Sequence, residues 1–119
     1  MNQYRVKFSK KSYSHLLEIK NYIKDTLQAP LTAKEFLNKL HKRMAALSSM
    51  PARYPVIKKY NNHNIHRMTL GNFLVYFYIK EELKEELKEV RILAVIYGKA
   101  AQLPALKKIL KDIQREVGD

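Results

Sequence analysis

The sequence predicts an α+β fold in which a helical hairpin packs on a small, mainly antiparallel four-stranded sheet. The expected element order is β-α-α-β-β-β-α. Three observations lead to this prediction: polar and apolar residues alternate near the start, two stretches follow with apolar residues at helical spacing, and three apolar, β-favouring segments come later. The 119 residues suffice for one modest core, so residues 1–119 are expected to form a single domain.

The first third of the chain predicts one strand and the first helix. Residues 3–8 alternate with period two and read as a half-buried strand. Ser9 or Ser12 can cap the helix that follows. Apolar residues recur at helical spacing from Tyr13 to Leu27, and Ala29-Pro30 interrupts the chain.

A second amphipathic helix is expected after this break. Thr32 and Glu35 have the spacing of a capping box, and Met50-Pro51 ends the helix. Two amphipathic helices joined by so short a link should pack as an antiparallel hairpin. Residues 51–64 contain two prolines and a polar run, so we expect a loop there.

The next segments have β character. Ile65–Leu70 alternates, Gly71-Asn72 is a turn signal, and Phe73–Ile79 is almost wholly apolar, as in a central strand. Glu89–Tyr97 is a further strand. Because the links between these strands are short, the three should form an antiparallel meander.

The remaining segments complete the expected architecture. Lys80–Lys88 is charged and helix-prone, but its place between two β segments favours an extended connection that forms a hairpin tip. Pro104–Val117 is expected to form a last helix. The first strand must join the same sheet, since a lone strand is not stable. The helices should cover one sheet face and leave the other partly open for a basic groove.

The distribution of charge is the strongest functional signal. The formal net charge is +12, from 23 basic and 11 acidic residues, and no acidic residue occurs from Phe36 to Lys80. That stretch holds eight lysines and arginines: Lys39, Lys42, Arg43, Arg53, Lys58, Lys59, Arg67 and Lys80. A surface with so much uncompensated positive charge favours a polyanionic ligand, most simply nucleic acid, or an acidic protein.

Several other function classes are disfavoured. Without cysteine the chain has no disulfides and no thiolate metal site, and its four histidines show no metal-ligand spacing, so we expect neither a metal nor another cofactor. The chain shows no Gly-rich phosphate loop. No apolar run is long enough to span a membrane, and the first residues lack the apolar core of a signal peptide. We therefore expect a cytoplasmic protein.

Three segments of the chain form a family-like pattern: Tyr4–Ser9, Leu70–Phe77 and Val90–Lys99. In this pattern, which is densest in the last two segments, the chain resembles RelE/ParE-type toxins of bacterial toxin–antitoxin systems. The similarity extends over nearly the whole chain. It rests on the order and spacing of these segments, since no single motif among them is diagnostic. The resemblance implies a small basic toxin that a cognate acidic antitoxin neutralises in a hetero-oligomeric complex.

Members of this family differ in target. RelE-like members cut messenger RNA in the ribosomal A site, whereas ParE-like members poison DNA gyrase. Our hypothesis from the sequence is ribosome-dependent mRNA cleavage without a metal. Two alternatives remain open, namely a non-enzymatic poison of DNA gyrase and an inactive relative that only binds its antitoxin.

The expected catalytic set is incomplete. Family members commonly carry a basic run after the last strand, but Tyr97-Gly98-Lys99-Ala100-Ala101 lacks the second basic residue and the acid. Leu74 stands where RelE-like nucleases tend to have an arginine. Whether the protein is an enzyme is therefore open, with a metal-independent endoribonuclease as the favoured reading.

RNA cleavage by attack of the 2′-hydroxyl needs a base, cations that stabilise the phosphorane, and an acid. Arg67 is the best phosphate clamp, because a guanidinium can engage phosphate through two N–H groups. Lys99 is a candidate phosphate contact, Tyr97 a candidate acid or base, and His63 can reach in from its loop. His66 should point to the sheet face opposite Arg67.

Five further residues are candidates for binding nucleic acid. They are basic or aromatic and lie in the acid-free stretch: Lys42, Arg53, Lys58, Lys59 and Tyr60. Tyrosines interleaved with cations suit single-stranded RNA, because bases stack on the rings while the cations contact phosphates. Each cation alone is also consistent with a solvated surface charge.

Overall fold

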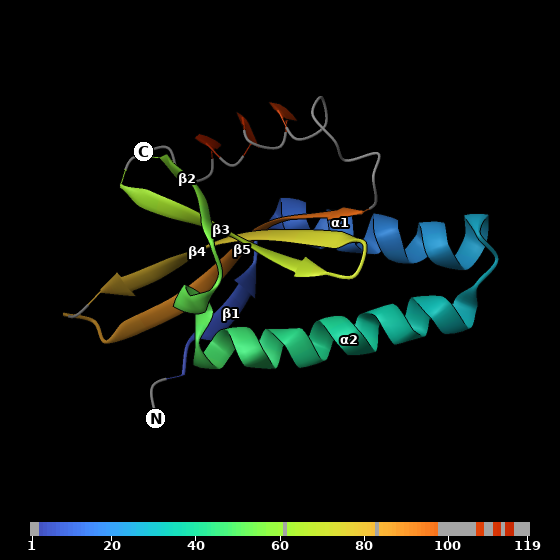
Figure 1. The fold of residues 1–119 in the computed structure, drawn as a ribbon, viewed down its shortest axis with the longest axis horizontal. Helices are drawn as coiled ribbons and strands as arrows, with labels where there is room; N and C mark the ends of the chain where they lie inside the picture. Colours follow the sequence, from blue (N-terminus) through green and yellow to red (C-terminus); the bar gives the residue numbers. More distant parts are fainter. Residues whose placement is uncertain are drawn as a thin grey trace.

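In the computed structural model, two antiparallel helices pack against one face of a five-stranded sheet (Figure 1). The structure describes residues 3–60, 62–82, 84–97, 107–108, 111–112 and 114–115. The elements, in order, are β1 (Arg5–Phe8), α1 (Lys10–Asn21), the π-helical turn η1 (Tyr22–Thr26), α2 (Pro30–Ser49), the 3-10 turn η2 (Pro51–Arg53), β2 (Val56–Tyr60), β3 (His63–Leu70), β4 (Phe73–Glu82) and β5 (Leu87–Tyr97).

The sheet has the strand order β1-β5-β4-β3-β2. Strands β3 to β5 form the expected antiparallel meander, which β2 extends at its edge, and β1 joins the sheet by pairing in parallel with β5. The α+β class, the helical hairpin and the mainly antiparallel sheet are therefore confirmed. The expected number of four strands was wrong, because β2 is a fifth.

Strand β2 lies within residues 51–64, which were expected to form a loop. Val56–Tyr60 pairs with β3, with a register shift between Val56 and Lys58, and the backbone N–H of Arg67 donates to the carbonyl oxygen of Pro55 at 3.0 Å. The strand is short, lies at the sheet edge and carries two lysines. Such features protect an edge from pairing with other chains and also hide the alternation that marks a strand in sequence.

A side chain caps the start of α1, whereas α2 begins at a proline without a side-chain cap. Ser9 caps α1, since its Oγ accepts a hydrogen bond from the Ser12 backbone N–H at 3.0 Å. Helix α1 ends at Asn21 and continues as η1, which is earlier than the expected end near residue 27. The capping box at Thr32 and Glu35 was wrong, because Pro30 occupies the first turn of α2 and Ala29, which has no capping side chain, precedes it.

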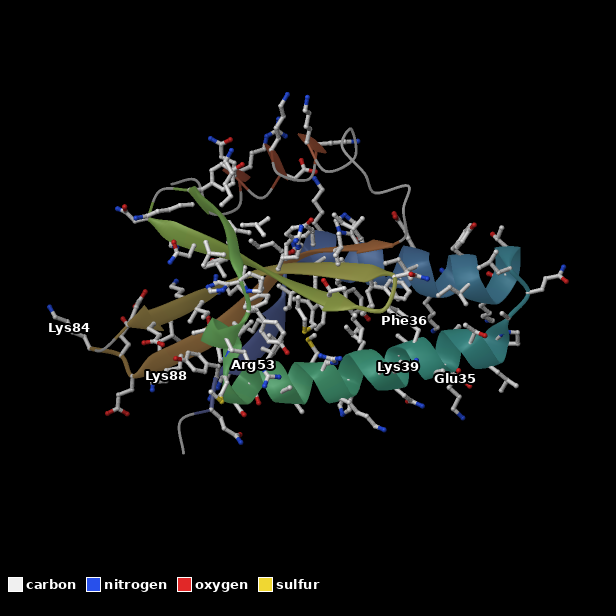
Figure 2. All side chains as sticks on the ribbon, viewed as in Figure 1. Glu35, Phe36, Lys39, Arg53, Lys84 and Lys88 are labelled. Atoms are coloured by element: carbon white, nitrogen blue, oxygen red, sulfur yellow. The ribbon has the colours of Figure 1, made fainter. Side chains whose placement is uncertain are left out.

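Two hairpins organise the meander. Gly71 begins the β3–β4 turn with a φ of 58°, the left-handed conformation that glycine adopts at the first position of such turns. The β4–β5 hairpin continues past the other strands, with Glu82 opposite Leu87 and a turn at residues 84–86. Figure 2 shows Lys84 and Lys88 on this projecting arm, far along the molecule from Glu35 and Lys39 on α2. The expected extended, charged connection is confirmed.

The core has two parts on opposite sheet faces. The helices bury the first part against apolar side chains such as Met68, Val75 and Phe77, each fully buried. The opposite side of the sheet, which we call the second face, holds a smaller cluster of buried residues: Ile65, Tyr76, Tyr78, Leu93, Ala94 and Ile96. Burying such a side chain contributes about 1.5–3 kcal/mol.

The predicted last helix, Pro104–Val117, lies mostly outside the described residues. Its described positions, 107–108, 111–112 and 114–115, are helical. Asp112 forms an ion pair of 2.8 Å with Lys11 at the start of α1. This contact holds the pKa of Asp112 below its usual value, mainly through the hydrogen bond from Lys11. Within the described part of the chain, no helix has the length and apolar character needed to cross a membrane.

Candidate functional site

The alternation of β3 places Arg67 and His66 on opposite sides of the sheet, as expected. His66 is buried on the helix side, where its ring stacks on Phe77 with the centroids 5.2 Å apart, and its Nδ1 lies 2.8 Å from the carbonyl oxygen of Tyr54. A carbonyl only accepts, so Nδ1 carries the proton of this bond. His66 is thus a structural histidine, and Arg67 is the residue that belongs to the second face.

Arg67 lies beside Tyr76, its register partner on β4. Tyr76 is fully buried, and no hydrogen bond to its hydroxyl is found among the described residues. Burial raises the pKa of Tyr76, while the nearby Arg67 guanidinium acts in the opposite direction. An arginine and an unsatisfied hydroxyl therefore lie next to each other on the second face.

Three more of the predicted residues extend this region toward β2. Tyr60 and His63 are register partners, and the His63 ring meets the Tyr78 ring edge-on with the centroids 5.1 Å apart. The Lys58 ammonium lies 5.5 Å from the centre of the Tyr60 ring, within the range of a cation–π contact. Together with Arg67, these side chains combine cations with aromatic rings on one surface.

The other predicted residues lie elsewhere. Lys59 pairs with Asn64 and alternates to the other side of β2. Arg53 lies in η2, where it donates to the Tyr54 hydroxyl at 3.0 Å. Tyr97 is the last residue of β5, opposite Phe73, and Lys99 lies outside the described residues. The structure thus groups Lys58, Tyr60, His63 and Arg67 and separates the rest of the set from them.

Lys42 lines a groove on the helix side of the molecule. The groove has a volume of about 560 Å³ and lies between α2, η1 and the β3–β4 turn. Its floor is apolar, with Phe36 and Phe73 in ring contact at 4.1 Å, and three cations, Lys39, Lys42 and Arg43, line it with a single acid, Glu35. Figure 2 shows Glu35, Phe36 and Lys39 close together on α2. An apolar floor with a basic rim suits an amphipathic, acidic segment of a protein.

Cations of both surfaces are largely uncompensated. Within the described part of the chain, ion pairs involve Lys7, Lys11, Lys80 and Arg91, whereas the seven cations from Lys39 to Arg67 form none. The described residues also contain no group of histidine and acidic side chains arranged to hold a metal. The electrostatic character of both surfaces is therefore set by lysine and arginine.

Sequence reasoning missed one polar cluster on the second face. Glu89 is 2% exposed and pairs with both Lys7, at 2.9 Å, and Arg91, at 2.8 Å. Lys7 becomes a neighbour of Arg91 only because β1 pairs in parallel with β5. No local pattern indicates this pairing, since residues 7 and 91 are distant in sequence.

Comparisons with known proteins agree with this fold. The family model described as ParE toxin of type II toxin–antitoxin system, parDE, matches residues 6–102. A solved structure titled "Chromosomal ParDE TA system from P. aeruginosa" is similar in fold, with a TM-score of 0.64 and 17% identity over 83% of this chain and 100% of that chain. The search of curated proteins gave no match. Because the family model spans most of the sequence, the chain belongs to the family of ParE toxins of type II toxin–antitoxin systems.

Proposed function

We propose that this protein is a toxin that inhibits DNA gyrase by binding it and that an acidic antitoxin neutralises it in the cytoplasm. The observation that carries the proposal is the set of seven cations from Lys39 to Arg67 without an ion-pair partner in the described part of the chain. Membership in the ParE family supports gyrase as the target, because ParE-like members poison gyrase. The cations would contact acidic surfaces of gyrase or the DNA bound to it.

The groove beside α2 is the proposed seat of the antitoxin. Its apolar floor would take alternate apolar side chains of an amphipathic segment, and Lys39, Lys42 and Arg43 would meet its carboxylates. Nearby large apolar side chains are also exposed, including Leu27 at 48% and Leu31 at 75%. A partner that covers them would stabilise the folded toxin, so the complex is expected to be the more stable form.

A second candidate function, cleavage of messenger RNA, is favoured by the arrangement around Arg67. A guanidinium beside the Tyr76 hydroxyl, with His63, Lys58 and Tyr60 on the same surface, supplies a phosphate clamp, stacking rings and a titratable group. The roles of Tyr97 as acid or base and Lys99 as phosphate contact belong to this candidate. So does binding of the RNA backbone by Lys42, Arg53 and Lys59.

Induced expression in bacterial cells separates the two candidates. Loss of plasmid supercoiling in arrested cells, with intact message ends, is the result expected for a gyrase poison. Message ends that map within codons, with normal supercoiling, would overturn the gyrase proposal in favour of cleavage. Growth without arrest would contradict both and leave only antitoxin binding.

Two variants sharpen the same experiment. Arg67→Ala should remove message cleavage if Arg67 clamps a phosphate, whereas Lys34→Ala removes the same charge from an exposed position on α2 and serves as the control.

An assay with purified gyrase tests the first candidate directly. An excess of toxin should inhibit DNA supercoiling by gyrase in this assay. If an excess of the wild-type toxin does not inhibit supercoiling, gyrase is ruled out as the direct target.

A further inference from the structure

A cationic pocket lies on the second face at the β1–β5 pair, and it shares no lining residue with the groove and does not include Arg67. It has a volume of about 330 Å³ and is lined by Lys7, Ser9, Tyr78, Arg91 and Leu93. Phe8 and Ile92 also border it, although their side chains pack into the core on the helix side. Lys7 and Tyr78 are the register partners of Arg91 on its two sides, so these three residues form one row across β1, β5 and β4. The sheet therefore brings two cations and one hydroxyl to the same place.

Glu89 holds the two cations of this row in fixed positions. Its Oε2 accepts from Lys7 Nζ at 2.9 Å, and its Oε1 accepts from Arg91 Nε at 3.0 Å and from an Arg91 terminal nitrogen at 2.8 Å. The side chain of Glu89 is almost completely buried beneath them, at 2% exposure. These hydrogen bonds hold the pKa of Glu89 below its usual value, first through Lys7 and then through Arg91. Glu89 therefore stays ionised at neutral pH.

One carboxylate leaves this cluster with a net positive charge. An ammonium group has three N–H donors and a guanidinium five, and the bonds to Glu89 use one from Lys7 and two from Arg91. Arg91 also interacts with the neighbouring Tyr78 hydroxyl. Both cations still reach solvent at the pocket, since the Lys7 and Arg91 side chains are 55% and 38% exposed. The first turn of α1 follows Ser9 directly and adds the partial positive charge of a helix N-terminus.

We propose that this pocket binds a phosphate group, supplied either by a nucleic-acid backbone or by a small phosphorylated or inorganic anion. Two cations in fixed positions with unused N–H donors match the tetrahedral oxygens of phosphate, and prior positioning by Glu89 lowers the entropy lost on binding. The pocket is too small for a folded partner, but a single phosphate fits.

Titration of the full-length chain with inorganic phosphate, followed by NMR at constant ionic strength, tests the proposal. Saturable shifts at residues 7–9, 78 and 91–93 are expected. Lys7→Ala should weaken phosphate binding by about tenfold, the value of one charge-assisted hydrogen bond. Lys7→Arg should retain most of the affinity. Lys34→Ala, which removes one charge from an exposed position on α2, is the matched control and should bind like the wild-type chain.

A second titration distinguishes the sources of the phosphate. A short single-stranded oligonucleotide that shifts the same residues and is displaced by inorganic phosphate would identify the backbone as the ligand. Saturation by phosphate with no response to the oligonucleotide would identify a small anion. Either result supports the site, whereas equal affinities of Lys7→Ala and Lys34→Ala, or shifts without saturation, would overturn it. Neither readout depends on which target the toxin inhibits.

Discussion

His66 stacks on Phe77 with an interplanar angle of 10°, while its Nδ1 bonds to the carbonyl oxygen of Tyr54 at 2.8 Å. The Tyr54 ring in turn meets Phe77 edge-on, with the centroids 6.0 Å apart. One buried histidine therefore ties the segment before β2 to the middle of β4. This contact fixes how the edge of the sheet, with its lysines, is attached to the core.

Replacing His66 should destabilise the protein. His66→Ala removes a packed ring and leaves the Tyr54 carbonyl without its donor, so the free energy of unfolding should fall by about 2–4 kcal/mol. Urea denaturation followed by circular dichroism measures this change. His41→Ala, at an exposed position on α2, is the control and should stay within about 0.5 kcal/mol of the wild type. Equal unfolding midpoints for both variants would show that His66 has no structural role.

The faces of the strands could be predicted from sequence, but the partners of the outer strands could not. Alternation in β3 was enough to assign Arg67 and His66 to opposite faces. No local sequence pattern indicates the parallel pairing of β1 with β5. The ion pair of Lys7 with Glu89 and the position of Lys7 opposite Arg91 could therefore not be predicted. Strand β2 was missed for a related reason, since its stability comes from pairing with β3 and not from its own apolar pattern.

The same distinction applies to the candidate site. Lys58, Tyr60, His63 and Arg67 are brought together because β2 and β3 are neighbours along the chain. Lys42 is basic and lies in the same acid-free stretch, but the helices cover the opposite face, so it lines a different surface. Charge along a sequence thus predicts that basic surfaces exist, whereas packing decides how many there are.

Glu89 should make stability depend on acid pH. Lys7 and Arg91 hold its pKa below the usual value of 4.5, so the unfolded chain binds this proton more readily than the folded chain. The resulting stabilisation is fully present above pH 4.5 and is lost as the pH falls through the lower, folded-state pKa. Thermal unfolding of the wild type and of Glu89→Gln between pH 3 and 7 measures this loss of stability. The difference between the two proteins should shrink as the pH falls, and a constant difference would contradict this account.

The buried hydroxyl of Tyr76 should contribute little to stability or oppose it. Because no described residue satisfies it, Tyr76→Phe should leave the free energy of unfolding unchanged or raise it by up to about 1 kcal/mol. Burial raises the pKa of Tyr76, so the folded state keeps its proton longer than the unfolded chain does. This residue therefore disfavours folding progressively as the pH rises past its usual value of 10, and the Phe variant should lose less stability there. Denaturant unfolding at neutral and alkaline pH tests both points, and a clear loss of stability in Tyr76→Phe at neutral pH would reveal a hydrogen-bond partner.

Reversing one charge at the groove should slow capture of the antitoxin. Lys42→Glu places a carboxylate among the cations that line the groove, where it would repel an approaching acidic segment. Electrostatic attraction acts mainly on association, so the association rate should fall by about tenfold and depend less on salt, while dissociation changes less. Stopped-flow or surface binding measurements with the cognate antitoxin give both rates.

Lys34→Glu makes the same change of charge on the same helix, at an exposed position that does not line the groove. If net charge alone attracted the antitoxin, the two variants would associate equally slowly, because both lower the net charge by two. If the groove is the docking site, the antitoxin must associate more slowly with Lys42→Glu than with Lys34→Glu. The carboxylate of Lys42→Glu would lie within a few ångströms of the bound segment. The charge of Lys34→Glu lies outside the groove, and its field is screened over roughly 8 Å at physiological salt. Equal rates at every salt concentration would therefore place the antitoxin elsewhere on the toxin.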